Sequence, residues 1–137
     1  MKAKFTGHDT FPLRYGWLFK AINHLNNKSN FSSSEDSIRN SVVKLGVGKN
    51  MVKAIQYWAE SSGVIKRSPQ GEYGHYVTES GKYLFGAADK KGLDPFLELP
   101  GSIWLLHFWL NFDNESLTAY RYFFNYSNVQ HFEKSKL

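Results

Sequence analysis

The sequence predicts a mainly α-helical fold with one small β hairpin. Apolar residues recur at helical spacing in three successive stretches between residues 14 and 61. Two short strand-like runs then flank a Pro- and Gly-containing turn, and the last third of the chain is dense in aromatic side chains. The 137 residues suit one domain with a single core. Cysteine is absent, which excludes disulfide frameworks, cysteine-ligated zinc and thiol nucleophiles.

The first two helices are expected at residues 14–27 and from about residue 35 to residue 45. The first has one apolar face, made of Leu13, Trp17, Leu18, Ala21, Ile22 and Leu25. Before the second, Ser32 lies three residues from Glu35, and Ser33 three from Asp36. At this spacing a serine hydroxyl can cap a free N–H and an acid can stabilise the positive helix end. Gly46 is expected to end the second helix.

Residues 49–61 are expected to form a third helix with two contrasting faces. Its apolar face is made of Val52, Ile55, Trp58 and Ala59. Its solvent face is expected to carry Lys49, Asn50, Lys53, Gln56, Tyr57 and Glu60. Two helices joined by a short glycine-containing turn are typical of a helix-turn-helix. The second helix of that motif presents its N-terminal polar residues to the DNA major groove.

A basic hairpin is expected next, with strands at residues 64–67 and 73–77 and a turn at 68–71. Its polar residues are Lys66, Arg67, Gln70 and His75. Thr78 is expected to cap a helix at residues 79–85, and residues 76–81 resemble the Tyr-x-Thr-x-x-Gly ending of many winged-helix domains. A hairpin after a helix-turn-helix is a wing, so Lys66, Arg67 and Gln70 are expected to hold phosphates. The fold expected is a winged helix-turn-helix followed by an aromatic-rich helical segment.

The distribution of charge divides the chain into two regions. Residues 1–91 carry 14 basic and 7 acidic side chains, a net charge of +7, and residues 92–137 carry 3 basic and 5 acidic, a net charge of −2. We therefore expect a winged-helix region with an N-terminal arm at 1–91 and an aromatic helical extension at 92–137. The basic region indicates double-stranded DNA as partner. Two alternatives stay open: the basic face is merely solvated, or the winged helix docks on proteins.

The second region holds 11 of the 23 aromatic residues. A helix from residue 102 to about 112 is apolar nearly all round, so it is expected to be buried or at an interface, with Trp104, Phe108 and Trp109 as interface residues. A further helix is expected from residue 113 through Phe124. We expect this region to pack on material missing from this chain, or to form a homodimer. Base stacking on it is disfavoured because its local charge is negative.

The N-terminal arm offers the weak catalytic candidates His8, Asp9 and Arg14. Adjacent residues rarely point at one centre, and no further ligand cluster follows at metal-binding spacing, so no metal site is expected. The favoured alternative is that His8 and Asp9 cap the first helix and hold the arm in place. No cofactor is expected in this chain.

A membrane-spanning segment is not expected. The longest apolar tract, residues 103–110, is interrupted by His107 and is far shorter than the roughly 20 residues that a spanning helix needs. The N-terminus has no continuous apolar stretch of the kind found in signal peptides. A cytoplasmic location is expected.

Three ordered motifs resemble the family known as domain of unknown function 4007. The first is GHDTFPLRYGW at residues 7–17, where the family usually has Glu in place of Asp9. The second is LGVGKNMVK at residues 45–53 followed by Tyr57-Trp58, and the third is Asp94-Pro95 with WLLH at residues 104–107. Members of this family are longer than 137 residues, so the chain is expected to be the N-terminal part of a longer protein.

The resemblance implies a role in bacterial DNA modification. The family is similar to the B component of Ssp-type DNA phosphorothioation systems, which replace a backbone oxygen with sulfur in antiphage defence. That component resembles a DNA-nicking endonuclease, so the full-length protein is expected to nick DNA, with a divalent metal as its expected cofactor and other system subunits as partners. This chain alone is expected to be a non-catalytic DNA-binding domain. A chain that itself nicks DNA with His8, Asp9 and Arg14 is the lowest-ranked alternative.

Overall fold

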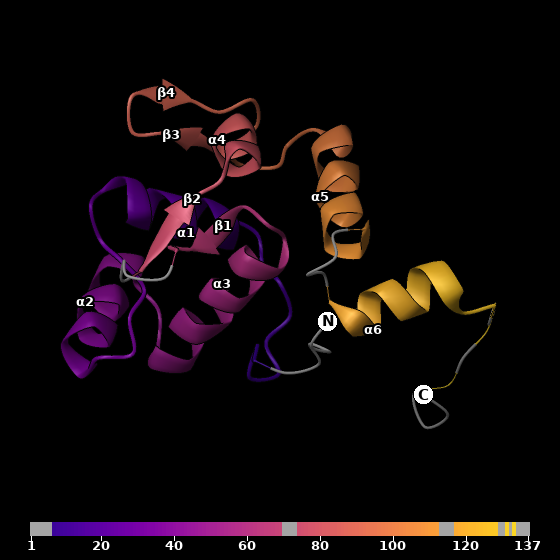
Figure 1. Cartoon of the computed structure of the whole chain (residues 1–137), viewed down its shortest axis with the longest axis horizontal. Helices are drawn as coiled ribbons and strands as arrows, with labels where there is room; N and C mark the ends of the chain where they lie inside the picture. The colour runs from indigo at the N-terminus through magenta and orange to yellow at the C-terminus, as the bar shows by residue number, and fades with distance from the viewer. Residues whose placement is uncertain (1–6, 70–73, 113–116, 129–130, 132, 134–137) are drawn as a thin grey trace.

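The computed structural model describes residues 7–69, 74–112, 117–128, 131 and 133 (Figure 1). Helices dominate the described residues and the strands are short, which confirms the mainly α fold with a small β hairpin. The elements in chain order are α1 (Trp17–Asn26), α2 (Glu35–Leu45), α3 (Lys49–Ser61), β1 (Ile65–Arg67), β2 (His75–Val77), α4 (Glu79–Phe85), β3 (Gly86–Ala87), β4 (Lys90–Lys91), α5 (Pro100–Phe112), α6 (Thr118–Arg121) and the π-helical turn η1 (Tyr122–Tyr126).

The core lies where α1, α3, α4 and the β1–β2 hairpin meet. Its most deeply buried large side chains include Leu18, Ile22, Ile55, Ile65 and Leu84. The predicted apolar face of α3 is buried throughout, from Val52 to Ala59. The 3.6-residue spacing of these positions places them on one side of the helix, so burying them fixes which side of α3 remains in water.

The ends of α2 show how local chemistry sets the path of the chain. Ser34 is the N-cap, and its hydroxyl accepts a hydrogen bond from the N–H of Ser37. The expectation that Ser32 or Ser33 caps the helix is therefore wrong; the Ser32 hydroxyl instead accepts from the N–H of Ser34. Gly46 ends the helix as predicted, with the left-handed φ of 65° that glycine adopts without strain. The chain then turns directly into α3.

The β1–β2 hairpin is joined to α4 through Thr78 and Gly81. Its register pairs Ile65 with Val77 and Arg67 with His75. The Thr78 side chain caps α4 as predicted and donates to the carbonyl of Gly63 at 2.7 Å. Gly81 lies so close to this hairpin that a Cβ at its position would be 2.3 Å from the carbonyl oxygen of Val64. A second small hairpin, β3–β4, was not expected from the sequence.

Helix α5 begins at Pro100, two residues before the start expected at residue 102. Asp94 holds the segment before α5 through two hydrogen bonds. Its carboxylate accepts from the N–H groups of Glu98 and Leu99 at 2.9 and 2.8 Å. Burial acts to raise the pKa of Asp94, but the backbone hydrogen bonds from Leu99 and Glu98 outweigh it and lower the pKa.

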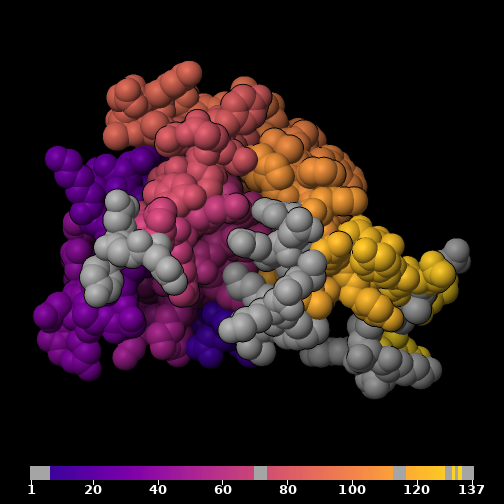
Figure 2. Space-filling model, viewed as in Figure 1, coloured from indigo at the N-terminus to yellow at the C-terminus, as the bar shows by residue number. Residues whose placement is uncertain are grey.

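The aromatic segment packs on one side of the molecule. Figure 2 shows α6 and η1, in yellow, extending outward beyond α5. The helix expected through Phe124 is present as α6 and the π-helical turn η1, while its expected start at 113–115 lies outside the described residues. Within the described ranges, none of the helices has the length and apolarity to cross a membrane.

Candidate nucleic-acid interface

The first turns of α3 present three polar residues to solvent, as the sequence predicted. Lys49, Asn50 and Lys53 are exposed. Lys49 and Lys53 are four residues apart, so they lie on the same side of the helix. Gly48 precedes them as an extended N-cap without a side chain of its own, which leaves the start of the helix open to a ligand.

A groove lies between α3, α2 with the segment before it, and the β1–β2 hairpin. Its basic residues are Lys49 and Lys53 from α3 and Arg67 from β1. Glu35 is the acidic residue of its wall. The rest of the lining consists of Asn30, Phe31, Ser32, Ser33, Ile38, Ser41, Val52, Gln56, Gly74 and His75. Cations from a helix and from a hairpin therefore converge on one concave surface, which suits a ligand with several phosphates.

Glu60 connects α3 to the hairpin at the end of this groove. Its Oε1 lies 2.7 Å from the His75 Nε2, accepts from the Gln56 amide at 2.8 Å, and lies 3.7 Å from the Arg67 Nε. Burial alone would raise the pKa of Glu60, but the hydrogen bonds from His75 and Gln56, with the charge of Arg67, hold it at about 2. We call Gln56, Glu60, Arg67 and His75 the Glu60 cluster. It links α3 to the β1–β2 hairpin through side-chain contacts.

The Glu60 cluster changes the roles of two predicted contacts. The amide nitrogen of Gln56 donates to Glu60, so this end of the side chain is engaged within the protein. Arg67 keeps a side chain that is 74% exposed, and it can reach a ligand while it remains near Glu60. The sequence placed Glu60 on the polar face of α3, but nothing in the sequence pairs it with His75.

Lys66 and Arg67 point to opposite sides of the hairpin, because successive strand residues alternate. Arg67 lines the groove with Lys49 and Lys53, whereas Lys66 lines a different groove, beside Tyr76 and Trp109. The structure therefore does not place these two cations on one surface. Gln70 lies outside the described residues.

The sequence placed Tyr57 on the solvent side of α3, but this side chain is buried, with 7% exposed. The N-terminal arm covers it: the His8 ring lies edge-on to Tyr57 at 5.3 Å and stacks on Trp58 at 5.8 Å. Gly7 is packed so tightly that a Cβ would be 2.5 Å from the Tyr57 ring. The indole N–H of Trp58 donates to the Phe11 carbonyl at 2.9 Å. The arm therefore buries the side chain that was expected to reach a ligand.

The structure does not bring the three weak catalytic candidates to one centre. His8 packs on Tyr57 and Trp58, Asp9 is exposed in a tight turn, and the Arg14 guanidinium lies 5.4 Å from the centre of the Trp17 ring. His8 and Asp9 do not cap α1, whose N-cap is Gly16 with no side-chain hydrogen bond. His8 does hold the arm against α3, as the favoured alternative proposed. Among the described residues, no group of three His, Asp or Glu side chains is arranged to hold a metal ion.

Helix α5 exposes an aromatic face. Trp104 is 72% exposed, and Phe108 and Phe112, which stack at 4.6 Å, are 51% and 59% exposed. We call Trp104, Phe108 and Phe112 the α5 aromatic face; they follow one another at four-residue spacing. Trp109, which was grouped with them, instead packs partly buried against the core. Helix α5 was expected to be buried or at an interface; it is not buried on every side in this chain, and the interface interpretation of Trp104 and Phe108 stays a prediction.

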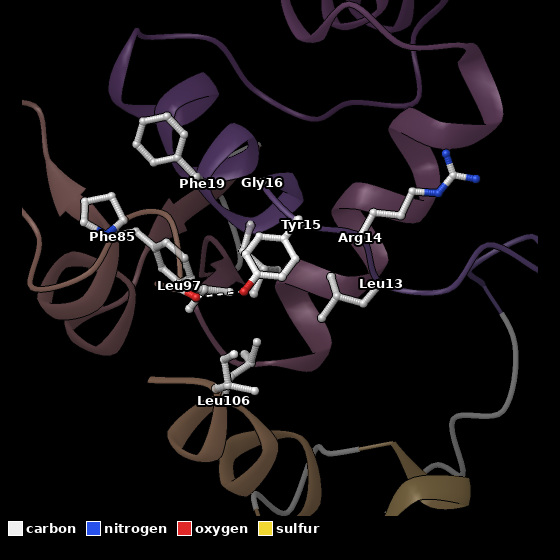
Figure 3. A pocket seen from close by; sticks show the side chains of 11 residues that line it. Leu13, Arg14, Tyr15, Gly16, Phe19, Phe85, Leu97 and Leu106 are labelled. Atoms are coloured by element: carbon white, nitrogen blue, oxygen red, sulfur yellow. Dashed lines mark hydrogen bonds between the residues drawn. The ribbon is translucent and has the colours of Figure 1, made fainter. Parts of the chain in front are cut away.

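A separate apolar pocket lies where the arm, α1 and the segment before α5 meet (Figure 3). Its volume is about 180 Å³. Leu13, Phe19, Phe85 and Leu106 contribute to its wall, and the Tyr15 hydroxyl donates to the carbonyl of Leu97 at 2.9 Å. Its lining is almost wholly apolar, so it is a packing defect between elements rather than a second polar site.

The segments that carry the three sequence motifs contact one another. Trp58 of the second motif donates to Phe11 of the first, and Tyr15 of the first donates to Leu97 near the third. A family profile described as Protein of unknown function (DUF4007) matches residues 5–137. The chain belongs to this family. The predicted resemblance is thereby confirmed.

Two solved structures resemble this DUF4007 chain. One, described as "Magnesium ion-bound SspB crystal structure", is 33% identical with a TM-score of 0.61 and covers 80% of this chain and 31% of that chain. The other, "SspB crystal structure", is 34% identical with a TM-score of 0.60 and covers 80% of this chain and 32% of that chain. The chain thus spans about a third of the length of these SspB chains. No curated protein matches it.

Proposed function

We propose that this chain is a DNA-binding winged helix-turn-helix module. In this proposal α2 and α3 form the helix-turn-helix, the β1–β2 hairpin is the wing, and residues 1–91 and 92–137 are the two regions. The observation that carries it is the convergence of Lys49, Lys53 and Arg67 on one groove. Lys49, Asn50 and Lys53 would enter a groove of duplex DNA, and Arg67 would hold a phosphate.

The likeness to SspB supports a place in a bacterial DNA phosphorothioation system of antiphage defence. This chain covers about a third of each of the similar structures, so the nicking of DNA for sulfur insertion is proposed for the longer protein. One of them is described as magnesium ion-bound, which supports a divalent metal for that reaction. In this division of labour the present chain binds the duplex and the remainder of the protein carries the chemistry.

The test is the salt dependence of duplex binding for Lys49→Ala with Lys53→Ala. The logarithm of affinity should fall less steeply with the logarithm of salt, by about 0.9 for each lost phosphate contact. The matched control is Lys90→Ala with Lys91→Ala, which removes two exposed cations of β4 outside the groove. The proposal fails if the first double variant binds like the wild type, or if both double variants lose the same affinity.

Protein docking is the second candidate function, and the exposure of the α5 aromatic face favours it. Its occupant would be another subunit of the modification complex or a second copy of the chain. Sedimentation of the purified chain with and without duplex DNA separates the two functions. For docking, Trp104→Ala should abolish a complex that forms without DNA, and salt-sensitive DNA binding should be absent.

A further inference from the structure

A second groove lies on the other flank of the β1–β2 hairpin, away from the proposed duplex site. Its volume is about 590 Å³, which is within the roughly 300–1,000 Å³ of small-molecule sites. Three regions of the chain form it: the hairpin, the start of α4, and α5. Its lining consists of Ser62, Gly63, Lys66, Tyr76, Val77, Thr78, Glu79, Ser80, Lys82 and Trp109.

This groove combines aromatic rings with cations. Lys66 and Tyr76 are register partners on adjacent strands, so their side chains lie on the same face of the hairpin. Tyr76 is 46% exposed. Trp109 of α5 also lines the groove, although it is 33 residues from Tyr76 in the sequence. Lys82 is ion-paired with Glu79 at 2.7 Å, whereas Lys66, the other cation of this wall, is exposed.

Base stacking was disfavoured because residues 92–137 carry a negative charge, and the fold removes this objection. Trp109 lies in the region with a net charge of −2, whereas Lys66, Tyr76 and Lys82 lie in the region with a net charge of +7. Folding places the Trp109 ring, from residues 92–137, beside the cations of residues 1–91. An aromatic ring beside a cation is the arrangement that binds unpaired nucleotides, because the ring stacks on a base while the cation meets a phosphate.

We infer that this groove binds a single-stranded segment of DNA next to the duplex held by α3. The bases of a duplex are already paired and stacked, so exposed rings add little to duplex binding. An unpaired base can stack on Tyr76 or Trp109, and its phosphate can reach Lys66. The inference rests on the proposed function, since it extends the same DNA across the hairpin. Lys66 thereby becomes a contact to an unpaired strand, and Arg67 remains a contact to the duplex.

The test measures the binding of two fluorescent ligands, a short oligo-dT strand and a hairpin duplex, by polarisation. Tyr76→Ser should weaken oligo-dT binding about tenfold, the effect of losing one stacked base. Lys66→Gln should weaken it less and should flatten its salt dependence. Both variants should bind the duplex within about twofold of the wild type. The matched control is Tyr83→Ser, which removes an exposed tyrosine of α4 that does not line the groove.

Each outcome separates this inference from the proposed function. A wild type that binds the duplex but not oligo-dT overturns the inference and leaves the proposed function intact. A wild type that binds oligo-dT through Tyr76 but does not bind the duplex supports this groove and overturns the proposed function. Equal losses in Tyr76→Ser and Tyr83→Ser, or no loss in Tyr76→Ser and Lys66→Gln, overturn the inference. Displacement of oligo-dT by poly-glutamate at equal charge overturns it too, because the groove would then be a general polyanion site.

Discussion

Replacing Glu60 by Gln should remove a pH-dependent part of the folding stability. The pKa of Glu60 is lowered from 4.5 to about 2 in the folded chain, and its side chain is 18% exposed. A group with a lowered folded pKa stabilises the fold above its unfolded pKa, and this contribution is lost as the pH falls towards the folded pKa. A shift of this size corresponds to about 3 kcal/mol at neutral pH.

The assay is urea unfolding of the wild type and Glu60→Gln at several pH values. The difference between their free energies of unfolding should be largest above about pH 5 and should shrink by about half at pH 3. Taking the difference removes the contribution of His24, whose pKa is lowered by burial and which also destabilises the fold in acid. The control is Glu79→Gln, because the Glu79 side chain is 90% exposed, so its ion pair should contribute less than about 1 kcal/mol.

A difference that does not change between pH 6 and pH 3 would refute the reasoning. It would mean that Glu60 is not held ionised by His75, Gln56 and Arg67, and that the hairpin is positioned by packing alone. Because these residues link α3 to the hairpin, Glu60→Gln should also weaken duplex binding, although Glu60 is itself negatively charged.

Two further predictions concern the backbone. Thr10 has a left-handed φ of 64°, which costs a β-branched residue about 1–2 kcal/mol. Thr10→Gly should therefore raise the free energy of unfolding by up to about 1 kcal/mol. A loss of stability in urea would show that the turn at 8–11 is not strained. Gly81→Ala should lower it by about 1–3 kcal/mol, because the new Cβ would meet the carbonyl of Val64. Gly101→Ala, which adds a Cβ in open space, is its control and should stay within about 0.5 kcal/mol; equal effects at the two glycines would contradict the close approach at Gly81.

The local structure of the first 85 residues could be predicted from the sequence because it depends on neighbours along the chain. The bounds of α3, the glycine that ends α2 and the Thr78 cap each follow from spacing and capping chemistry over a few residues. Ser34 in place of Ser32 or Ser33 is an error of one or two residues. Three consecutive serines offer similar caps, so local spacing alone does not decide between them.

The candidate site could be predicted only in part, because its decisive contacts join distant residues. The pairing of Glu60 with His75 spans 15 residues and the packing of His8 on Tyr57 spans 49, so helical spacing indicates neither. Lys66 and Arg67 are adjacent in sequence and face opposite grooves, since the strand alternates. The apolar composition of α5 indicated burial or an interface but not which side packs; only one side of the helix packs on the core of this chain.

The most direct test of the central claim is to map the amide chemical shifts of the labelled chain during titration with a short DNA duplex. The claim predicts that the shifts concentrate at Gly48, at residues 49–56 of α3 and at Arg67, and that they diminish as salt is added. It also predicts small shifts along α5. Shifts confined to the α5 aromatic face, or an unchanged spectrum at low salt, would contradict duplex binding by the groove between α3 and the hairpin.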